Sequence, residues 1–212
     1  MTDRRPDYVR AAGVSCRVLL RLGTVRLPVS LEKVIGESHG IRLKTYCQFC
    51  REQGISREEF LSWAVSSHGF TLRRGRRAVI LYNEEKELPT IRFTIAHELG
   101  HLFLLHREGS RADELEANCF ARNLLCPAPA ARLLGLEGEE GYARTFRVSL
   151  PMARTALACR REDEANLDPR LAVRLEEALE RGRTARRPEA VVRFTAREDG
   201  WLCRAEDRWL EP

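Results

Sequence analysis

The feature that most constrains this chain is a helix that is apolar on nearly every side yet carries polar residues. The helix is predicted to begin at 88–90, and most of its circumference is apolar: Ile91, Phe93, Ile95, Ala96, Leu99, Leu102, Phe103 and Leu105. A helix of this kind is buried on most sides. Because burying unpaired polar groups is costly, the string HELGH at 97–101 needs a specific reason to be there.

The string HELGH has the spacing of a metal site. His97 and His101 are four residues apart, so their side chains lie on one face of the helix, one turn apart. Both imidazoles can bind one metal ion, with Glu98 beside the open coordination position. Zn²⁺ in a catalytic site takes three protein ligands and one water. We therefore expect a zinc site with a third ligand elsewhere in the chain.

The third ligand is expected on the helix that follows. The metzincin pattern is excluded, because Leu104 and Arg107 stand where that pattern has Gly and His. Ser110 and Asp113 form a capping-box signature for a helix that continues to 125, where Pro127 ends it.

A helical wheel separates the two carboxylates of that helix. At about 100° per residue, Glu114 shares a small, apolar face with Ala117, Asn118, Ala121 and Leu125. Glu116 lies opposite, on a face expected to be solvated, with Asp113 and Asn123. The first face suits packing against the HELGH helix. We therefore predict Glu114 as the third ligand and Asn118 as a hydrogen-bond partner of a ligand imidazole.

These parts predict hydrolysis of a peptide bond. Zinc lowers the pKa of its bound water to about 7, and Glu98 is expected to take the proton as general base and deliver it to the leaving amine. The preceding strand is expected to pair with an extended peptide substrate through Val79, Ile80, Leu81 and Tyr82. No residue stands out as the one that stabilises the oxyanion. The candidates each have a simpler structural interpretation: Tyr82, His106 and Arg92.

The rest of the chain predicts an α+β protein in which a small mixed sheet packs on the HExxH helix. Helical spacing and caps indicate helices at 7–22, 30–38 and from 56 to before 69, and β patterns indicate a strand at 41–46 and a hairpin at 70–83. We expect a metal-binding domain at 1–134, a helical segment at 135–184 and a C-terminal hairpin extension at 185–212.

Composition is that of a soluble globular protein. The 212 residues include 36 basic and 31 acidic side chains, for a net charge of +5. There is no run of about 18 apolar residues and no apolar segment behind the charged start, so we expect a cytoplasmic protein without membrane contact. Seven cysteines without a disulfide framework indicate reduced thiols. Cys47 and Cys50 form an isolated CxxC that we interpret as incidental.

Residues 141–160 leave an alternative open. They resemble a helix-turn-helix, in which Ser149 caps the second helix with Pro151 in its first turn. Four arginines could contact phosphates: Arg147, Arg154, Arg160 and Arg161. The alternative is thus a DNA-associated regulator that uses the HExxH fold as a binding scaffold. DNA binding is the less favoured hypothesis. A toxin–antitoxin or phage-defence partner that acts only in a complex fits the sequence as well.

Two strings together resemble the ImmA/IrrE metallo-endopeptidases, the M78 peptidase family: RFTIAHELGHLFLLH at 92–106 and ELEANCFARNLLCP at 114–127. The resemblance implies a minimal zincin-like fold, with His97, His101 and Glu114 as zinc ligands and Glu98 as the base. It also implies a bacterial or phage enzyme that cleaves a helix-turn-helix repressor encoded nearby, releasing genes of a mobile element or a stress response. Cys126 stands where the family usually has Met, which changes packing rather than chemistry.

Overall fold

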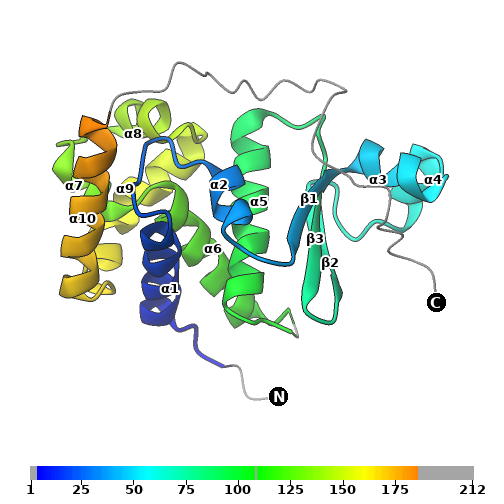
Figure 1. The fold of residues 1–212 in the computed structure, drawn as a ribbon, viewed down its shortest axis with the longest axis horizontal. Coiled ribbons are helices and arrows are strands. Elements are labelled where there is room, and N and C mark those ends of the chain that lie inside the picture. Colours follow the sequence, from blue (N-terminus) through cyan, green and yellow to red (C-terminus); the bar gives the residue numbers. More distant parts are fainter. Residues whose placement is uncertain (1–3, 108, 186–212) are drawn as a thin grey trace.

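The computed structural model describes residues 4–107 and 109–185. In chain order these ranges form α1 (Tyr8–Arg21), α2 (Leu31–Gly36), β1 (Ile41–Thr45), α3 (Tyr46–Gln53), α4 (Arg57–Trp63), β2 (Gly69–Arg74), β3 (Arg77–Tyr82), α5 (Leu88–Phe103), α6 (Arg111–Leu125), α7 (Ala128–Leu133), α8 (Glu139–Phe146), α9 (Leu150–Ala165) and α10 (Pro169–Thr184) (Figure 1). The predicted α+β class is confirmed. None of the described helices has the length and apolar character needed to cross a membrane.

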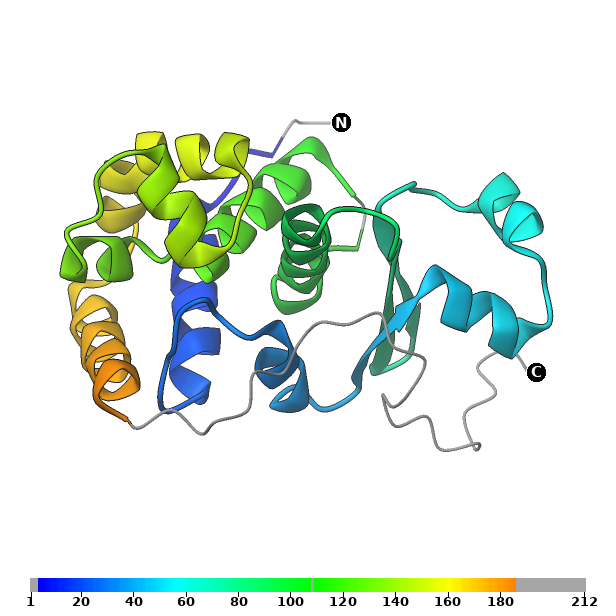
Figure 2. The ribbon, with the colours of Figure 1, turned by 90° about the horizontal axis from the view of Figure 1, so that it is seen from above.

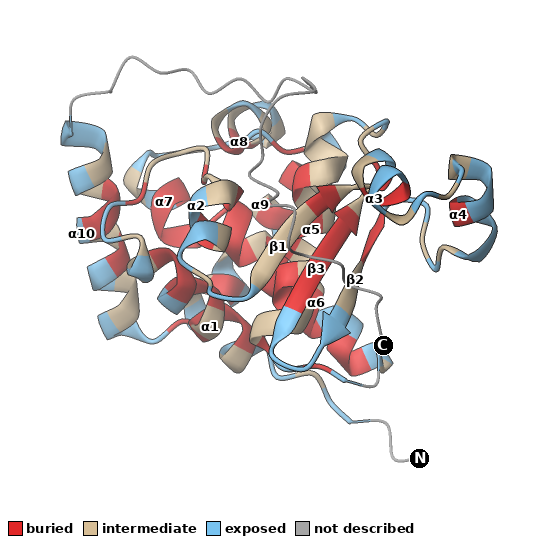
Figure 3. Ribbon diagram, turned by 45° about the vertical axis from the view of Figure 1, so that its right-hand side comes forward, coloured by how far each residue is buried: buried red, intermediate tan, exposed pale blue. Residues whose placement is uncertain are grey.

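The sheet places β3 in its centre. The strand order is β1–β3–β2, with β1 parallel and β2 antiparallel to β3. Most of β3 is buried, as Figure 3 shows. Both edges of β3 already carry a hydrogen-bonded neighbour. The prediction that this strand pairs with a peptide substrate is therefore wrong for Val79, Ile80, Leu81 and Tyr82.

Short polar side chains begin four of the helices at the predicted places. Ser30, Ser56, Ser110 and Ser149 each accept a hydrogen bond from the backbone N–H three residues on, at the starts of α2, α4, α6 and α9. Such caps satisfy N–H groups that have no partner within the helix. In α6 the side chain of Asp113 also accepts from the Ser110 N–H, which completes the predicted capping box.

The sequence prediction lacks helix α3, because it continues the first strand to 46 and names no helix between that strand and residue 56. Thr45 ends β1 and at once caps α3 in a reciprocal capping box with Gln48. This T-x-x-Q string is the signal that could have revealed the helix. Tyr46 and Phe49 then pack with Phe60 of α4 in a small aromatic core.

Helix α5 lies between the sheet and α6, and this position makes it the centre of the fold (Figures 1 and 2). Ile80 of β3 and Leu99 of α5 belong to the same main core. On the other side, Gly100 faces α6. A Cβ atom at Gly100 would lie 3.0 Å from the Cα of Ala117 and 3.1 Å from its carbonyl oxygen. The two helices can approach this closely only because no side chain stands between them.

The main core continues across the boundary predicted at 134/135. It includes residues from α1, α5, α6, α8 and α10, for example Leu19, Leu99, Phe120, Phe146 and Leu179. The metal-binding domain and the helical segment therefore share one hydrophobic core. The C-terminal hairpin predicted within 185–212 falls, after residue 185, outside the described residues.

Substitution of Gly100 tests the close approach of α5 and α6. We expect Gly100→Ala to destabilise the protein by about 1–3 kcal/mol, because the new methyl group meets backbone atoms that cannot move aside. Gly141→Ala is the matched control: it lies in α8, where a new methyl group would have no atom within 4 Å, and it should stabilise by about 0.5–1 kcal/mol. Denaturant unfolding measures both, and equal effects would contradict the expectation.

Candidate metal centre

Three side chains from α5 and α6 converge on one point. His97 and His101 place their Nε2 atoms 3.0 Å apart. The two carboxylate oxygens of Glu114 lie 3.3 Å from these nitrogens, one on each. The three residues form a group that could hold a metal ion. They are the residues predicted as ligands, and the structure brings them together.

The chemistry of this donor set fits a zinc ion. Tetrahedral bonds of about 2.0–2.1 Å place neighbouring donor atoms about 3.3 Å apart, which is close to the separations above. Two imidazole lone pairs this near to each other repel unless a proton or a cation lies between them. Burial, reinforced by His97 and His106, lowers the pKa of His101 to about 4. His101 is therefore neutral at pH 7, as a metal-binding imidazole must be.

Asn118 lies next to the other nitrogen of His97. Its Oδ1 atom is 3.0 Å from His97 Nδ1, where the sequence predicts a hydrogen bond to a ligand imidazole. An amide oxygen only accepts hydrogen bonds, so Nδ1 of His97 carries the proton. The Nε2 atom that faces Glu114 is then free to bind a metal ion.

Glu98 is held by the sheet. The hydroxyl of Thr71, on β2, donates to Glu98 Oε2 at 2.6 Å. Burial raises the pKa of Glu98, and the Thr71 hydrogen bond partly counteracts this effect. A carboxylate with a raised pKa is the usual form of a general base that works near neutral pH. The sequence prediction lacks Thr71, because nothing in a strand pattern tells which residue will face a distant helix.

One side of the cluster is open. The side chains of His97 and His101 are 17% and 13% exposed, whereas that of Glu114 is 51% exposed. A cavity of about 410 Å³ adjoins the cluster and is lined by Thr71, Arg73, Glu98, His101, His106, Arg107 and Gly109. A molecule in this cavity would contact both the predicted base and one predicted ligand.

The second carboxylate of α6 corrects the helical-wheel prediction. Glu116 is fully buried, and Asp113 and Asn123 beside it are 7% and 6% exposed, so their face is not solvated. The N-terminal segment and α1 cover this face. Glu116 accepts hydrogen bonds from the side chain of Arg4 at 2.7 Å and from the Asp7 N–H at 2.8 Å. A polar helix face can thus be buried when charged partners from another part of the chain cover it.

A second buried group around Glu116 also has metal-binding residue types. It consists of His106, Asp113 and Glu116. Arg4, however, donates to both carboxylates at 2.7 Å, and His106 Nε2 lies 3.0 Å from Glu116. Burial alone would raise the pKa of Glu116, but the hydrogen bonds from Asp7, Arg4 and His106 outweigh it and lower that pKa. Because the carboxylates are already compensated, this group is an ion-pair cluster.

The three candidates for oxyanion stabilisation have other contacts or positions. Arg92 is buried and donates to the carbonyls of Val29 and Phe146. His106 has both ring nitrogens close to other side chains. Tyr82 ends the central strand β3 and is half-buried. These contacts and positions agree with a structural role for the three side chains, and no contact among the described residues assigns one of them to the oxyanion.

The sequence profile of the M78 peptidases, described as the IrrE N-terminal-like domain, matches residues 51–158, which is half of the chain. The chain belongs to the M78 peptidase family. This match contains the whole convergence of α5 and α6 and the sheet strands β2 and β3. No curated protein is similar enough to this chain to count as a match. Membership of the family identifies the chain as a metallopeptidase-type protein, in agreement with the resemblance of its two motifs.

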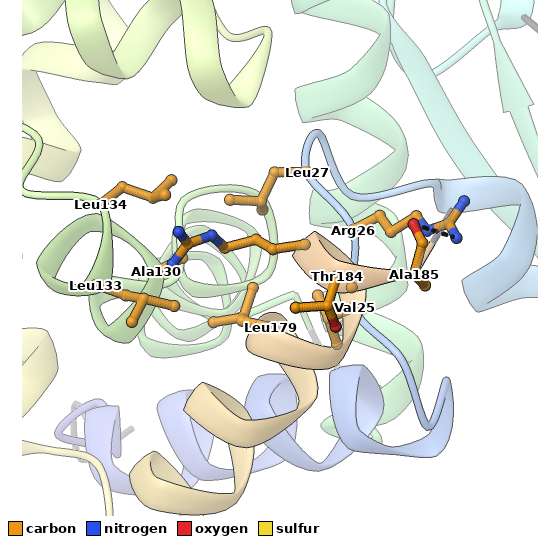
Figure 4. Close-up of a pocket in the computed structure, with 11 residues that line it drawn as sticks. Val25, Arg26, Leu27, Ala130, Leu133, Leu134, Leu179, Thr184 and Ala185 are labelled. Atoms are coloured by element: carbon orange, nitrogen blue, oxygen red, sulfur yellow. Dashed lines mark hydrogen bonds between the residues drawn. The ribbon is translucent and has the colours of Figure 1, made fainter. Parts of the chain in front are cut away.

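Another cavity lies away from this centre, between the 22–30 loop, α7 and α10. It measures about 510 Å³ and is lined mainly by apolar side chains, among them Leu27, Leu133, Leu134 and Leu179 (Figure 4). Arg26 lies at one side of this cavity and donates to the carbonyl of Ala185. The lining contains no histidine, cysteine or carboxylate, whereas the smaller cavity is lined by Glu98, His101 and His106.

The two helices of the helix-turn-helix-like segment predicted at 141–160 correspond to α8 and α9. Ser149 caps α9 and a proline stands in its first turn, as predicted. Two of its four named arginines are engaged within the protein: Arg154 pairs with Glu139, and Arg160 pairs with Glu164. DNA binding by this pair stays a prediction, and no contact in the described part of the chain favours it.

The lowered pKa of Glu116 predicts an acid-dependent stability. We expect Glu116→Gln to cost about 1.5–3 kcal/mol at pH 7, because charged hydrogen bonds are lost. The pKa of Glu116 is lower in the folded state than its ordinary 4.5, so the stabilisation is complete above pH 4.5 and is lost as the pH falls below it. The difference between wild type and variant should therefore shrink in that range.

Unfolding in denaturant between pH 3 and 7, with a metal chelator present, measures this difference. Glu140→Gln, at an exposed position on α8, is the control and should show little effect at any pH. A stability difference for Glu116→Gln that stays constant down to pH 3 would contradict the ionised, hydrogen-bonded state described above.

Proposed function

We propose that this M78 chain is a zinc-dependent endopeptidase that hydrolyses a peptide bond in a protein substrate, with Glu98 as general base. The observation that carries the proposal is the convergence of His97, His101 and Glu114 next to a buried carboxylate and an open cavity. Three protein ligands with one open position are typical of catalytic rather than structural zinc sites.

The metal ion and the side chains have separate tasks in the proposed reaction. When bound, zinc polarises the scissile carbonyl and acidifies a water molecule. Glu98 accepts the proton of this water and then donates it to the nitrogen of the leaving amine. Its hydrogen bond from Thr71 fixes the position of one carboxylate oxygen. The burial that raises the pKa of Glu98 makes it a better proton acceptor than an exposed carboxylate.

We infer that an extended substrate lies along β2 rather than β3. Within the described residues, β2 pairs with β3 on one edge and with no strand on the other. It is also the strand whose Thr71 contacts Glu98. Backbone groups at the free edge of a strand can hydrogen-bond an extended peptide. The same contacts would align the scissile bond with the base.

The partner we propose is a helix-turn-helix repressor encoded near this chain. The support is the resemblance of both sequence motifs to the ImmA/IrrE metallo-endopeptidases, for which such a repressor is the typical substrate. Incubation of the two purified proteins with zinc, with and without a chelator, tests this partner. Cleavage only without the chelator is the expected result.

Glu98→Gln separates catalysis from metal binding. We expect zinc to be retained, since Glu98 is not one of the three converging ligands, and cleavage to fall by about 10²- to 10⁴-fold, the usual contribution of a general base. Zinc content and a cleavage assay are measured on the same preparation. Cleavage at the wild-type rate would show that another residue accepts the proton.

Glu114→Ala tests the third ligand. We expect it to lose zinc under conditions where the wild-type protein keeps it, because only two protein donors remain. Glu140→Ala, an exposed carboxylate of α8, is the matched control and should bind zinc normally. Equal zinc affinities of the two variants would remove Glu114 from the site.

Thr71→Val tests the environment of the base. The hydroxyl of Thr71 lowers the pKa of Glu98, so its removal raises that pKa further. Because only the ionised carboxylate accepts a proton, kcat/KM should fall off at a higher pH on the acid side of its profile. Thr71→Ser should restore the wild-type profile. An unchanged acid limb in Thr71→Val would contradict the role of this hydrogen bond.

A further inference from the structure

The ring of His106 lies between a buried carboxylate and a predicted zinc ligand. His106 Nε2 is 3.0 Å from Glu116 Oε2, and His106 Nδ1 is 3.1 Å from His101 Nδ1. We propose that His106 and Glu116 are positioning residues that hold His101 in the orientation and tautomer required of a zinc ligand. This inference rests on the proposed function, since it takes His101 to be a ligand.

The direction of each hydrogen bond follows from the groups at the two ends. A carboxylate only accepts, so His106 donates to Glu116 from its Nε2–H. A neutral imidazole has one N–H, which leaves Nδ1 of His106 as an acceptor. His101 therefore donates to it from Nδ1–H. The Nε2 atom of His101, which faces Glu114 and His97, keeps its lone pair for a metal ion.

The backbone after α5 turns back to bring His106 beside His101. Leu105 has a φ of 57°, a left-handed conformation that apolar residues rarely adopt, and it is 73% exposed. The His106 N–H donates to the His101 carbonyl at 3.0 Å, and Arg73 of β2 donates to the His106 carbonyl at 2.7 Å. With the bond from the Leu105 N–H to the Leu102 carbonyl, this turn is a Schellman cap that ends α5, and the same cap places the His106 ring beside His101.

Glu116 is fixed independently of His106. Its Oε1 atom accepts hydrogen bonds from Arg4 and from the Asp7 N–H, whereas Oε2 lies 3.0 Å from His106 Nε2 and 3.7 Å from a guanidinium nitrogen of Arg10. A fixed anion at the end of two N–H groups polarises both and increases the basicity of the ligand nitrogen of His101. In the part of the chain that the structure describes, the Nδ1 atom of His97 is backed by a neutral amide, which makes the two predicted ligand histidines unequal.

Zinc affinity, measured by competition with a chelator at pH 7, tests this role. We expect His106→Leu to weaken zinc binding about 10- to 100-fold, because His101 loses its acceptor. Glu116→Gln should weaken it less, because an amide oxygen can still accept from His106 while the charge is lost. Asp163→Asn is the matched control: Asp163 is buried and pairs with Arg122 of α6 at 2.7 Å, away from the histidines.

The control separates positioning from a general loss of stability. A loss of affinity in His106→Leu no larger than that in Asp163→Asn would overturn the proposal. Failure of the wild-type protein to bind zinc would contradict the proposed function, and this inference with it. Tight zinc binding that is unchanged in His106→Leu contradicts this inference alone.

A second measurement does not depend on whether the variants fold. Nitrogen NMR of the histidine rings in the zinc-loaded wild-type protein should show His101 protonated at Nδ1 and His106 protonated at Nε2. Because pairing with Glu116 alone would also place the His106 proton at Nε2, the decisive signal is a hydrogen bond from His101 Nδ1–H to His106 Nδ1, and its absence would overturn the proposal. Protonation of His106 at Nδ1 instead would place two donors against each other and overturn the proposal.

Discussion

The contact between α5 and α6 at Gly100 and Ala117 is the constraint on which the rest of the structure depends. Two of the converging side chains stand on α5 and the third on α6, so the distance between the helices sets the separation of their donor atoms. A carboxylate side chain is short, and Glu114 reaches both imidazoles only because no side chain stands between the helices at Gly100. The same glycine lies inside HELGH, so one short string provides both the ligands and the space that the third ligand needs.

The opposite face of α6 is buried beneath the N-terminal segment and α1, and the same segment compensates the negative charge that is buried there. Glu116 and Asp113 are buried on α6, and two buried carboxylates without partners would be costly. Arg4 lies across both of them, and His106 approaches from the other side. The segment before α1 is therefore part of the site's support, although it is distant from the metal-binding motif in sequence.

The sequence predicts those parts of the site whose chemistry is local. HELGH, the capping box at Ser110 and the small face around Glu114 are short-range patterns, and the structure places them together. The error at Glu116 has a different origin. A helical wheel reports which residues share a face, but not what covers that face, and here the cover is a segment about a hundred residues earlier. The prediction for β3 fails in the same way, since a strand pattern does not tell whether a neighbour will pair on each edge.

The difference between the two histidines follows from this long-range cover. His97 has a neutral amide of α6 as its partner, and a wheel finds this residue because Asn118 lies one turn from Glu114 on the same face of α6. His101 has a partner that exists only because Leu105 turns the chain back and because Arg4 and Asp7 fix Glu116. Since the first pair is neutral and the second ends in an anion, the electron density on the two Nε2 atoms differs. The two histidines that would hold an ion therefore differ in their partners, and His101 is the one that lines the cavity beside Glu98.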